Sequence, residues 1–114
     1  MSIHHLISKI KSQPEEIDFA EVISAIEAHY DYTPTAFRNG ETMNEAGSNE
    51  GSCKIFAFAQ LNQLSPAETL ACFGKYYRED VLGNPTGSDH ANIRNFMQSG
   101  WTGVQFDQAA LSAK

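Results

Sequence analysis

The most reactive side chain in the sequence is that of Cys53, which precedes Lys54 and stands where a loop leads into an expected helix. A helix N-terminus and a neighbouring lysine both lower the pKa of a thiol and favour the nucleophilic thiolate. If His90 lay nearby, the two side chains could act as nucleophile and general base in a small hydrolase or transferase. A free cysteine is also commonly a small buried hydrophobic residue. Cys53 and His90 are therefore candidates for catalysis, but no third group that would orient His90 is evident, and the sequence does not favour an enzyme.

The loop 47–54 (GSNEGSCK) is a second feature with chemical potential, because it ends at the start of a helix. Free backbone N–H groups at such a start attract a small carboxylate or phosphate. The loop differs from a nucleotide-binding P-loop: three residues instead of four separate its glycines, and Ser-Cys precedes Lys54. The simpler interpretation, which the sequence favours, is a plain helix start that Asn49 or Ser52 caps.

Polar side chains are unusually dense in the segments that flank the apolar core. If these loops converge at helix N-termini, they form one polar site that favours an anionic group. The same side chains could instead form a structural network that pins the long loop onto the helices, since buried polar groups must be partnered. The candidate ligand-binding residues are Arg38, Asn39, Asn44, Asn49, Lys54, Asp89, His90 and Arg94.

Neither a metal site nor a cofactor is expected. A structural zinc site needs four nitrogen or sulfur ligands, whereas Asp89 and His90 supply two. The other histidines, His4, His5 and His29, are distant in the sequence and lack the spacing of a helical metal motif.

A protein partner is a further prospect, because tyrosine, tryptophan and arginine dominate the energetics of interfaces. The pattern at 76–78 (YYR) places Tyr77 in the core and leaves Tyr76 beside Arg78 at the surface. Trp101, in the setting GWTG, could add to the same surface, although a lone tryptophan in a small domain is more often part of the core.

Composition limits the classes of protein to which this chain can belong. Its 114 residues suffice for one domain, and 41% hydrophobic against 19% charged residues predicts a folded chain. A formal net charge of −6 argues against nucleic acid as a partner. No apolar run is long enough to span a membrane, the N-terminal segment lacks the pattern of a secretory signal, and two cysteines do not make a disulfide framework. These features predict a soluble, cytoplasmic protein.

Apolar spacing predicts about five helices. The first covers residues 3–11. The second begins at a capping box of Ser12 and Glu15 and runs to about His29. Residues 53–64 are apolar nearly all round and should form the central helix. The fourth helix follows the capping box of Ser65 and Glu68 and continues to the turn at 83–85. The fifth has Ser88 or Asp89 as its cap and ends at Gly100.

Two short segments predict a minor antiparallel sheet. Asn39-Gly40 favours a two-residue hairpin turn between short runs on either side. The alternating segment 101–106 should add a strand to this hairpin. The predicted fold is therefore mainly α (α+β), a single domain over residues 1–114.

Several segments, taken in order, resemble the HopJ type III effector family. They span about residues 33–106 and comprise 35–40 (TAFRNG), 44–54 (NEAGSNEGSCK), 73–78 (FGKYYR), 87–94 (GSDHANIR), 96–97 (FM) and 100–104 (GWTGV). The resemblance implies a bacterial protein, and the family takes its name from a protein delivered into plant cells by pathogenic pseudomonads. It implies no enzymatic activity, cofactor or catalytic residue, and it is the sole reason to consider secretion into a host cell.

Residues and resemblance together favour a protein-interaction or effector-type module. The alternatives are a domain that binds a small anion or other ligand, and a small hydrolase or transferase that uses Cys53 and His90.

Overall fold

Helices make up most of the computed structural model, which describes residues 2–114. Two small antiparallel sheets complete the fold, and the predicted mainly α class is confirmed. In chain order the elements are α1 (Ile3–Ser12), η1 (Pro14–Glu16), α2 (Phe19–His29), β1 (Tyr30–Tyr32), β2 (Phe37–Asn39), β3 (Thr42–Asn44), α3 (Glu50–Leu61), α4 (Pro66–Ala71), η2 (Tyr76–Val81), α5 (Ala91–Ser99), η3 (Gly100–Gly103), β4 (Val104–Phe106) and β5 (Leu111–Ala113).

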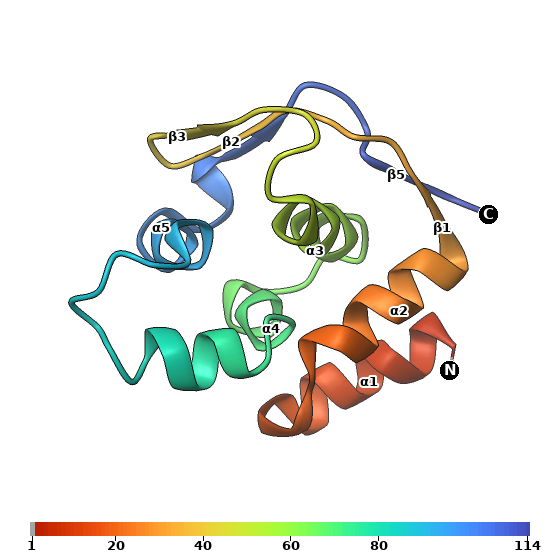
Figure 1. Ribbon diagram of the computed structural model, residues 1–114. Helices are drawn as coiled ribbons and strands as arrows, with labels where there is room; N and C mark the ends of the chain where they lie inside the picture. Colours follow the sequence, from red (N-terminus) through yellow and green to blue (C-terminus); the bar gives the residue numbers. More distant parts are fainter. Residues whose placement is uncertain (1) are drawn as a thin grey trace.

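Helix α3 lies at the centre of the molecule, as its apolar sequence predicts. Figure 1 shows it surrounded by α2, α4, α5 and the β2–β3 hairpin. Ile55, Phe56 and Phe58 are completely buried. The helix begins three residues earlier than expected, because Asn49 is its N-cap and the polar residues Glu50 to Ser52 form its first turn.

The second helix starts later than predicted. The Ser12 hydroxyl donates to the Ser8 carbonyl within α1 and caps nothing, and residues 14–16 form a 3-10 turn. The capping box belongs instead to Asp18 and Glu21, where the Asp18 backbone N–H donates to the Glu21 carboxylate at 2.9 Å. Both stretches contain the pattern of a capping box. The apolar face that begins at Phe19 is the one that packs on the core.

The predicted fourth helix is broken in two at Gly74. Helix α4 ends at Ala71, and the chain resumes as the π-helix η2 from Tyr76. Gly74 has φ +59°, and a Cβ there would lie 2.7 Å from the backbone nitrogen of Phe19. Only glycine fits this close approach to the start of α2, so the bend is imposed by a contact between distant parts of the chain.

Strand β2 pairs with β3 and with β4, so the predicted hairpin and the added strand are both present. The turn, however, is formed by Gly40 and Glu41, one residue later than expected, and Asn39 is a buried strand residue. Residues 100–103 form a 3-10 turn, which delays the last strand of this sheet to Val104. The pairing of β1 with β5 was not predicted, since each strand has three residues.

Helix α5 begins at Ala91 and has His90 in the N-cap position, so neither Ser88 nor Asp89 is the cap. Gly100 ends the helix with φ +59°, as predicted. None of the helices within residues 2–114 has the length and apolar character needed to cross a lipid bilayer.

Candidate functional site

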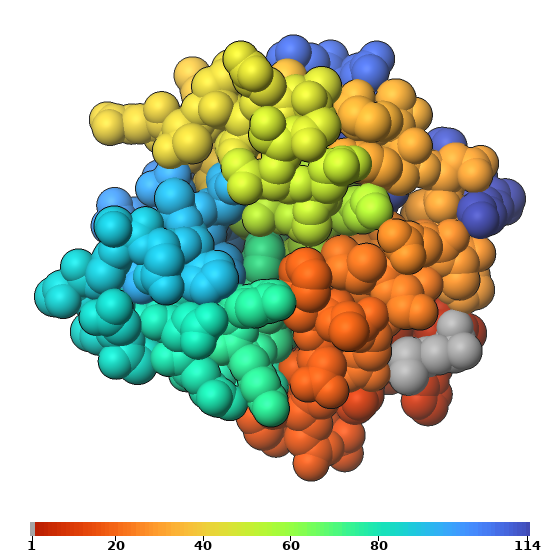
Figure 2. Space-filling model, viewed as in Figure 1, coloured from red at the N-terminus to blue at the C-terminus, as the bar shows by residue number. Residues whose placement is uncertain are grey.

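A cavity of about 370 Å³ opens where the N-termini of α3 and α5 approach the start of α2 and the start of η2. Figure 2 shows the hollow on the face where the segments near residues 19, 50, 75 and 90 meet. Its volume falls at the small end of the range for ligand pockets. The lining residues are Phe19, Thr42, Asn44, Asn49, Gly51, Ser52, Phe73, Tyr76, His90, Ala91, Asn92 and Ile93.

The two helix starts at the cavity are alike. Asn49 and His90, the N-caps of α3 and α5, both have φ 52°, in the left-handed region that non-glycine residues seldom adopt. Neither side chain caps its own helix. The backbone N–H groups of both first turns therefore lack the usual side-chain acceptor, and residues of both turns line the cavity.

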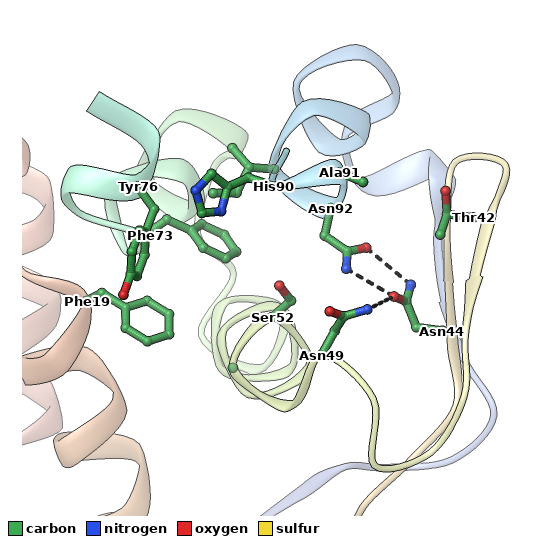
Figure 3. Close-up of a pocket in the computed structure, with 12 residues that line it drawn as sticks. Phe19, Thr42, Asn44, Asn49, Ser52, Phe73, Tyr76, His90, Ala91 and Asn92 are labelled. Atoms are coloured by element: carbon green, nitrogen blue, oxygen red, sulfur yellow. Dashed lines mark hydrogen bonds between the residues drawn. The ribbon is translucent and has the colours of Figure 1, made fainter. Parts of the chain in front are cut away.

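One wall of the cavity is a group of hydrogen-bonded asparagines. The carboxamides of Asn44 and Asn92 bond reciprocally, at 3.1 Å and 3.0 Å, as Figure 3 shows. Asn49 donates to the Asn44 carboxamide oxygen at 2.7 Å. Behind them, Asn39 is fully buried and donates to the Asn92 carboxamide oxygen at 3.0 Å and to its carbonyl at 2.8 Å. This wall joins β2, β3, the 45–49 loop and α5.

Aromatic rings form the opposite wall (Figure 3). The rings of Phe19 and Tyr76 meet edge to face at 5.1 Å, and the imidazole of His90 lies 5.2 Å from the Tyr76 ring. Phe73 stacks on Phe19 at 6.4 Å from the core side. The His90 Nε2 atom lies 3.1 Å from an Asp80 carboxylate oxygen, which fixes the ring across the start of α5.

The structure brings part of the predicted polar set together. Asn44, Asn49 and His90 line the cavity, and Asn39 supports Asn92 from behind. The remaining four residues have partners elsewhere: Arg38 donates to Gln105 across the sheet, Lys54 pairs with Glu27, and Arg94 pairs with Asp89 at 2.6 Å.

Sequence reasoning missed several of the residues that build this cavity. Phe19 and Phe73 fit the apolar pattern of the core and carry no separate signal. Asn92 does carry one: it stands four residues before Phe96, hence on the buried face of α5, and it is itself buried. A polar residue at a core position must find buried partners, which is a signal that the sequence alone contains.

Cys53 does not face the cavity and shares no partner with His90 in the described chain. It is buried, and its thiol donates to the Thr35 carbonyl at 3.7 Å. The buried hydroxyl of Tyr32 lies beside it. Burial raises the pKa of the Cys53 thiol, which outweighs the opposite effect of the neighbouring Tyr32, Thr35 and Lys54. The thiolate that a nucleophile requires is thus disfavoured.

We therefore expect Cys53 in the folded protein to react slowly with iodoacetamide, with a rate that rises only above the ordinary thiol pKa of about 8.5. Mass spectrometry of peptides labelled at increasing pH measures this rate, and protein unfolded in guanidinium gives the reference. The rate should be the same in a His90→Ala variant. Fast labelling near neutral pH that depends on His90 would contradict the placement of the thiol and restore the enzyme alternative.

The side chains expected to meet a protein partner have separate places in the fold. Tyr76 is 43% exposed and forms the rim of the cavity. Arg78 donates to the Ile17 carbonyl at 2.8 Å. Trp101 packs edge-on against Phe96 at 5.0 Å, and its indole N–H donates to the Leu64 carbonyl, so this side chain serves the core.

Within residues 2–114, no three or more His, Cys, Asp or Glu side chains are grouped closely enough to hold a metal ion.

Comparison with known proteins gives one family and one solved structure. The family model described as HopJ type III effector protein matches residues 3–111. A solved structure described as "Crystal structure of unknown function protein VPA0580" is similar with 54% sequence identity and a TM-score of 0.98, over 100% of this chain and 95% of that chain. No curated protein matches.

Proposed function

The chain belongs to the HopJ type III effector protein family, and on this premise we propose that it is a binding module whose cavity between α3, α5 and η2 takes a small ligand. The observation that carries the proposal is the pair of unlike walls, aromatic on one side and hydrogen-bonding on the other. Ligand pockets typically combine an apolar lining with a few fixed polar groups.

The polar wall is preorganised, because its side chains are held by hydrogen bonds within the protein. The reciprocal Asn44–Asn92 pair and its support from Asn39 hold the polar wall in place. A site whose groups are already ordered loses less entropy on binding, so such a site gains affinity.

Binding is favoured over catalysis by the chemistry of the lining. His90 is the one histidine in the lining, and its Nε2 atom is engaged with Asp80. Cys53 lies outside the lining. An effector-type role, with delivery into another cell, would use this binding site, and it rests on family membership alone.

Screening a library of small fragments by NMR tests the proposal. We expect weak binders to shift the backbone amide signals of residues 49–52, 76 and 90–93 together. Ala91→Trp, at an exposed lining position, should fill the mouth of the cavity and abolish these shifts. Gln98→Trp is the matched control, because residue 98 is exposed on the same helix and outside the cavity.

Shifts scattered over the surface, or binding that survives Ala91→Trp, would show that the cavity is not the binding site.

A further inference from the structure

The hydrogen-bonding capacity left over in the polar wall indicates what a ligand must offer. Asn44 has no free hydrogen-bonding group. Its side-chain amide nitrogen donates to the Phe37 carbonyl and to Asn92, and its carboxamide oxygen accepts from Asn49 and Asn92. A carboxamide has two donor hydrogens and two acceptor lone pairs, so all four are used. Asn44 is therefore a fixed platform and not a ligand contact.

Its neighbours retain free groups that point into the cavity. Asn49 uses one of its two donor hydrogens, and Figure 3 shows its carboxamide oxygen turned away from Asn44. Asn92 likewise uses one of its two side-chain N–H groups. The Ser52 hydroxyl, which Figure 3 places between these asparagines and Phe73, bonds to no other described residue. Donors and acceptors thus stand side by side, an arrangement that suits hydroxyl groups, since each hydroxyl both donates and accepts.

The aromatic wall opposite favours an apolar surface on the same ligand. Phe19, Phe73 and Tyr76 present aromatic carbon, and none of the three side chains makes a hydrogen bond within the described chain. A flat ring with C–H groups on its face buries apolar surface against such a wall while its edge reaches the polar groups opposite.

Charge in and around the cavity selects against an ion. No Asp, Glu, Lys or Arg lines it. Two charged pairs stand near it, Asp80 with His90 and Arg94 with Asp89. A cationic ligand would meet no carboxylate in the lining, and an anionic one would meet the backbone N–H groups of the two helix starts but no cationic Lys or Arg side chain.

We propose that the ligand is an uncharged hydroxylated ring, a single sugar residue in size and chemistry, which lies against the aromatic wall with its hydroxyl groups on Asn49, Ser52 and Asn92. This inference rests on the proposed function, because it assigns a ligand class to the same cavity. The volume of about 370 Å³ accommodates one such ring.

NMR titration with a panel of methyl glycosides tests the ligand class, with benzoate and inorganic phosphate as the charged comparison. We expect at least one glycoside to shift the amides of Ser52 and Asn92 with an affinity that is unchanged between low and high salt. Asn49→Gly keeps the left-handed backbone at the cap and removes the carboxamide, so it should weaken binding about fivefold, the effect of one lost hydrogen bond. Tyr76→Leu should weaken it by a similar factor, because it removes an aromatic ring from the apolar wall. Arg38→Ala, on the outer face of the sheet, should change nothing.

Two results would overturn the ligand class while leaving the binding function intact. One is salt-sensitive binding of benzoate or phosphate in the cavity when no glycoside binds. The other is glycoside binding that neither Asn49→Gly nor Tyr76→Leu weakens. If the fragment library as well as the glycosides leaves the cavity unperturbed, the proposed function itself fails, and the sugar assignment fails with it.

Discussion

Replacing Phe56 by alanine is expected to lower the free energy of unfolding by about 3–5 kcal/mol, the largest effect of any single truncation considered. Phe56 is completely buried in α3, and its ring contacts those of Phe37, Phe73, Phe96 and Trp101 at centroid distances of 5.0–6.4 Å. Its removal leaves a cavity at the point where the sheet, the chain after α4, and α5 with η3 meet. Urea denaturation followed by circular dichroism measures the change.

Leu61→Ala is the matched control for this prediction. Leu61 lies on the same helix but is 56% exposed, so its truncation should cost less than about 1 kcal/mol. If Phe56→Ala cost no more than Leu61→Ala, α3 would not be the central helix.

Replacing Asn92 by alanine should cost about 3 kcal/mol, although Asn92 belongs to no apolar cluster. Its side chain is the partner of both Asn39 and Asn44. Without it, buried donors on both residues and an acceptor on Asn44 lose a partner, and each buried polar group left unsatisfied costs about 1–3 kcal/mol. The loss should appear as a lower denaturation midpoint.

Asn84→Ala provides the comparison, because the Asn84 side chain is exposed and donates to no other residue in the described chain. It should change stability by less than about 0.5 kcal/mol. If the two asparagine variants were equally stable, the polar wall would contribute nothing to the stability of the fold. The argument that this wall is ordered before a ligand binds, and so gains affinity, would then fail.

Patterns that act within one element were predictable from the sequence. Residues 53–64 are apolar nearly all round, and a helix of this kind has to be buried on several sides, as α3 is over residues 55–59. Gly100 was correctly placed at the end of a helix, because a residue with positive φ is required there.

Boundaries set by contacts between distant segments were not predictable in the same way. Ser12 with Glu15 and Asp18 with Glu21 are equivalent as local patterns, and the packing of Phe19 decides between them. The break at Gly74 depends on the backbone of residues 17–19. The hairpin turn moved by one residue because Asn39 is needed inside the protein, where it bonds to Asn92.

The candidate site shows the same division. Asn49 and His90 could be named as candidates because each lies close to a predicted helix start, although the exact first residue of both helices was predicted wrongly. Phe19 comes from a segment far from Phe73 and Tyr76 in the sequence, and their meeting in one wall is a property of the tertiary fold.

The one-residue shift of the hairpin turn also protects the chain chemically. An asparagine followed by glycine is prone to spontaneous deamidation, in which the glycine nitrogen attacks the carboxamide carbon and closes a succinimide ring. In this protein the Asn39 carboxamide is held by Asn92 at 2.8 Å, and the Gly40 nitrogen donates to the Gly103 carbonyl at 3.0 Å. Both reacting groups are thus restrained in the native state and released on unfolding. The rate of deamidation at Asn39 therefore depends on how often the β2–β3 hairpin separates from α5.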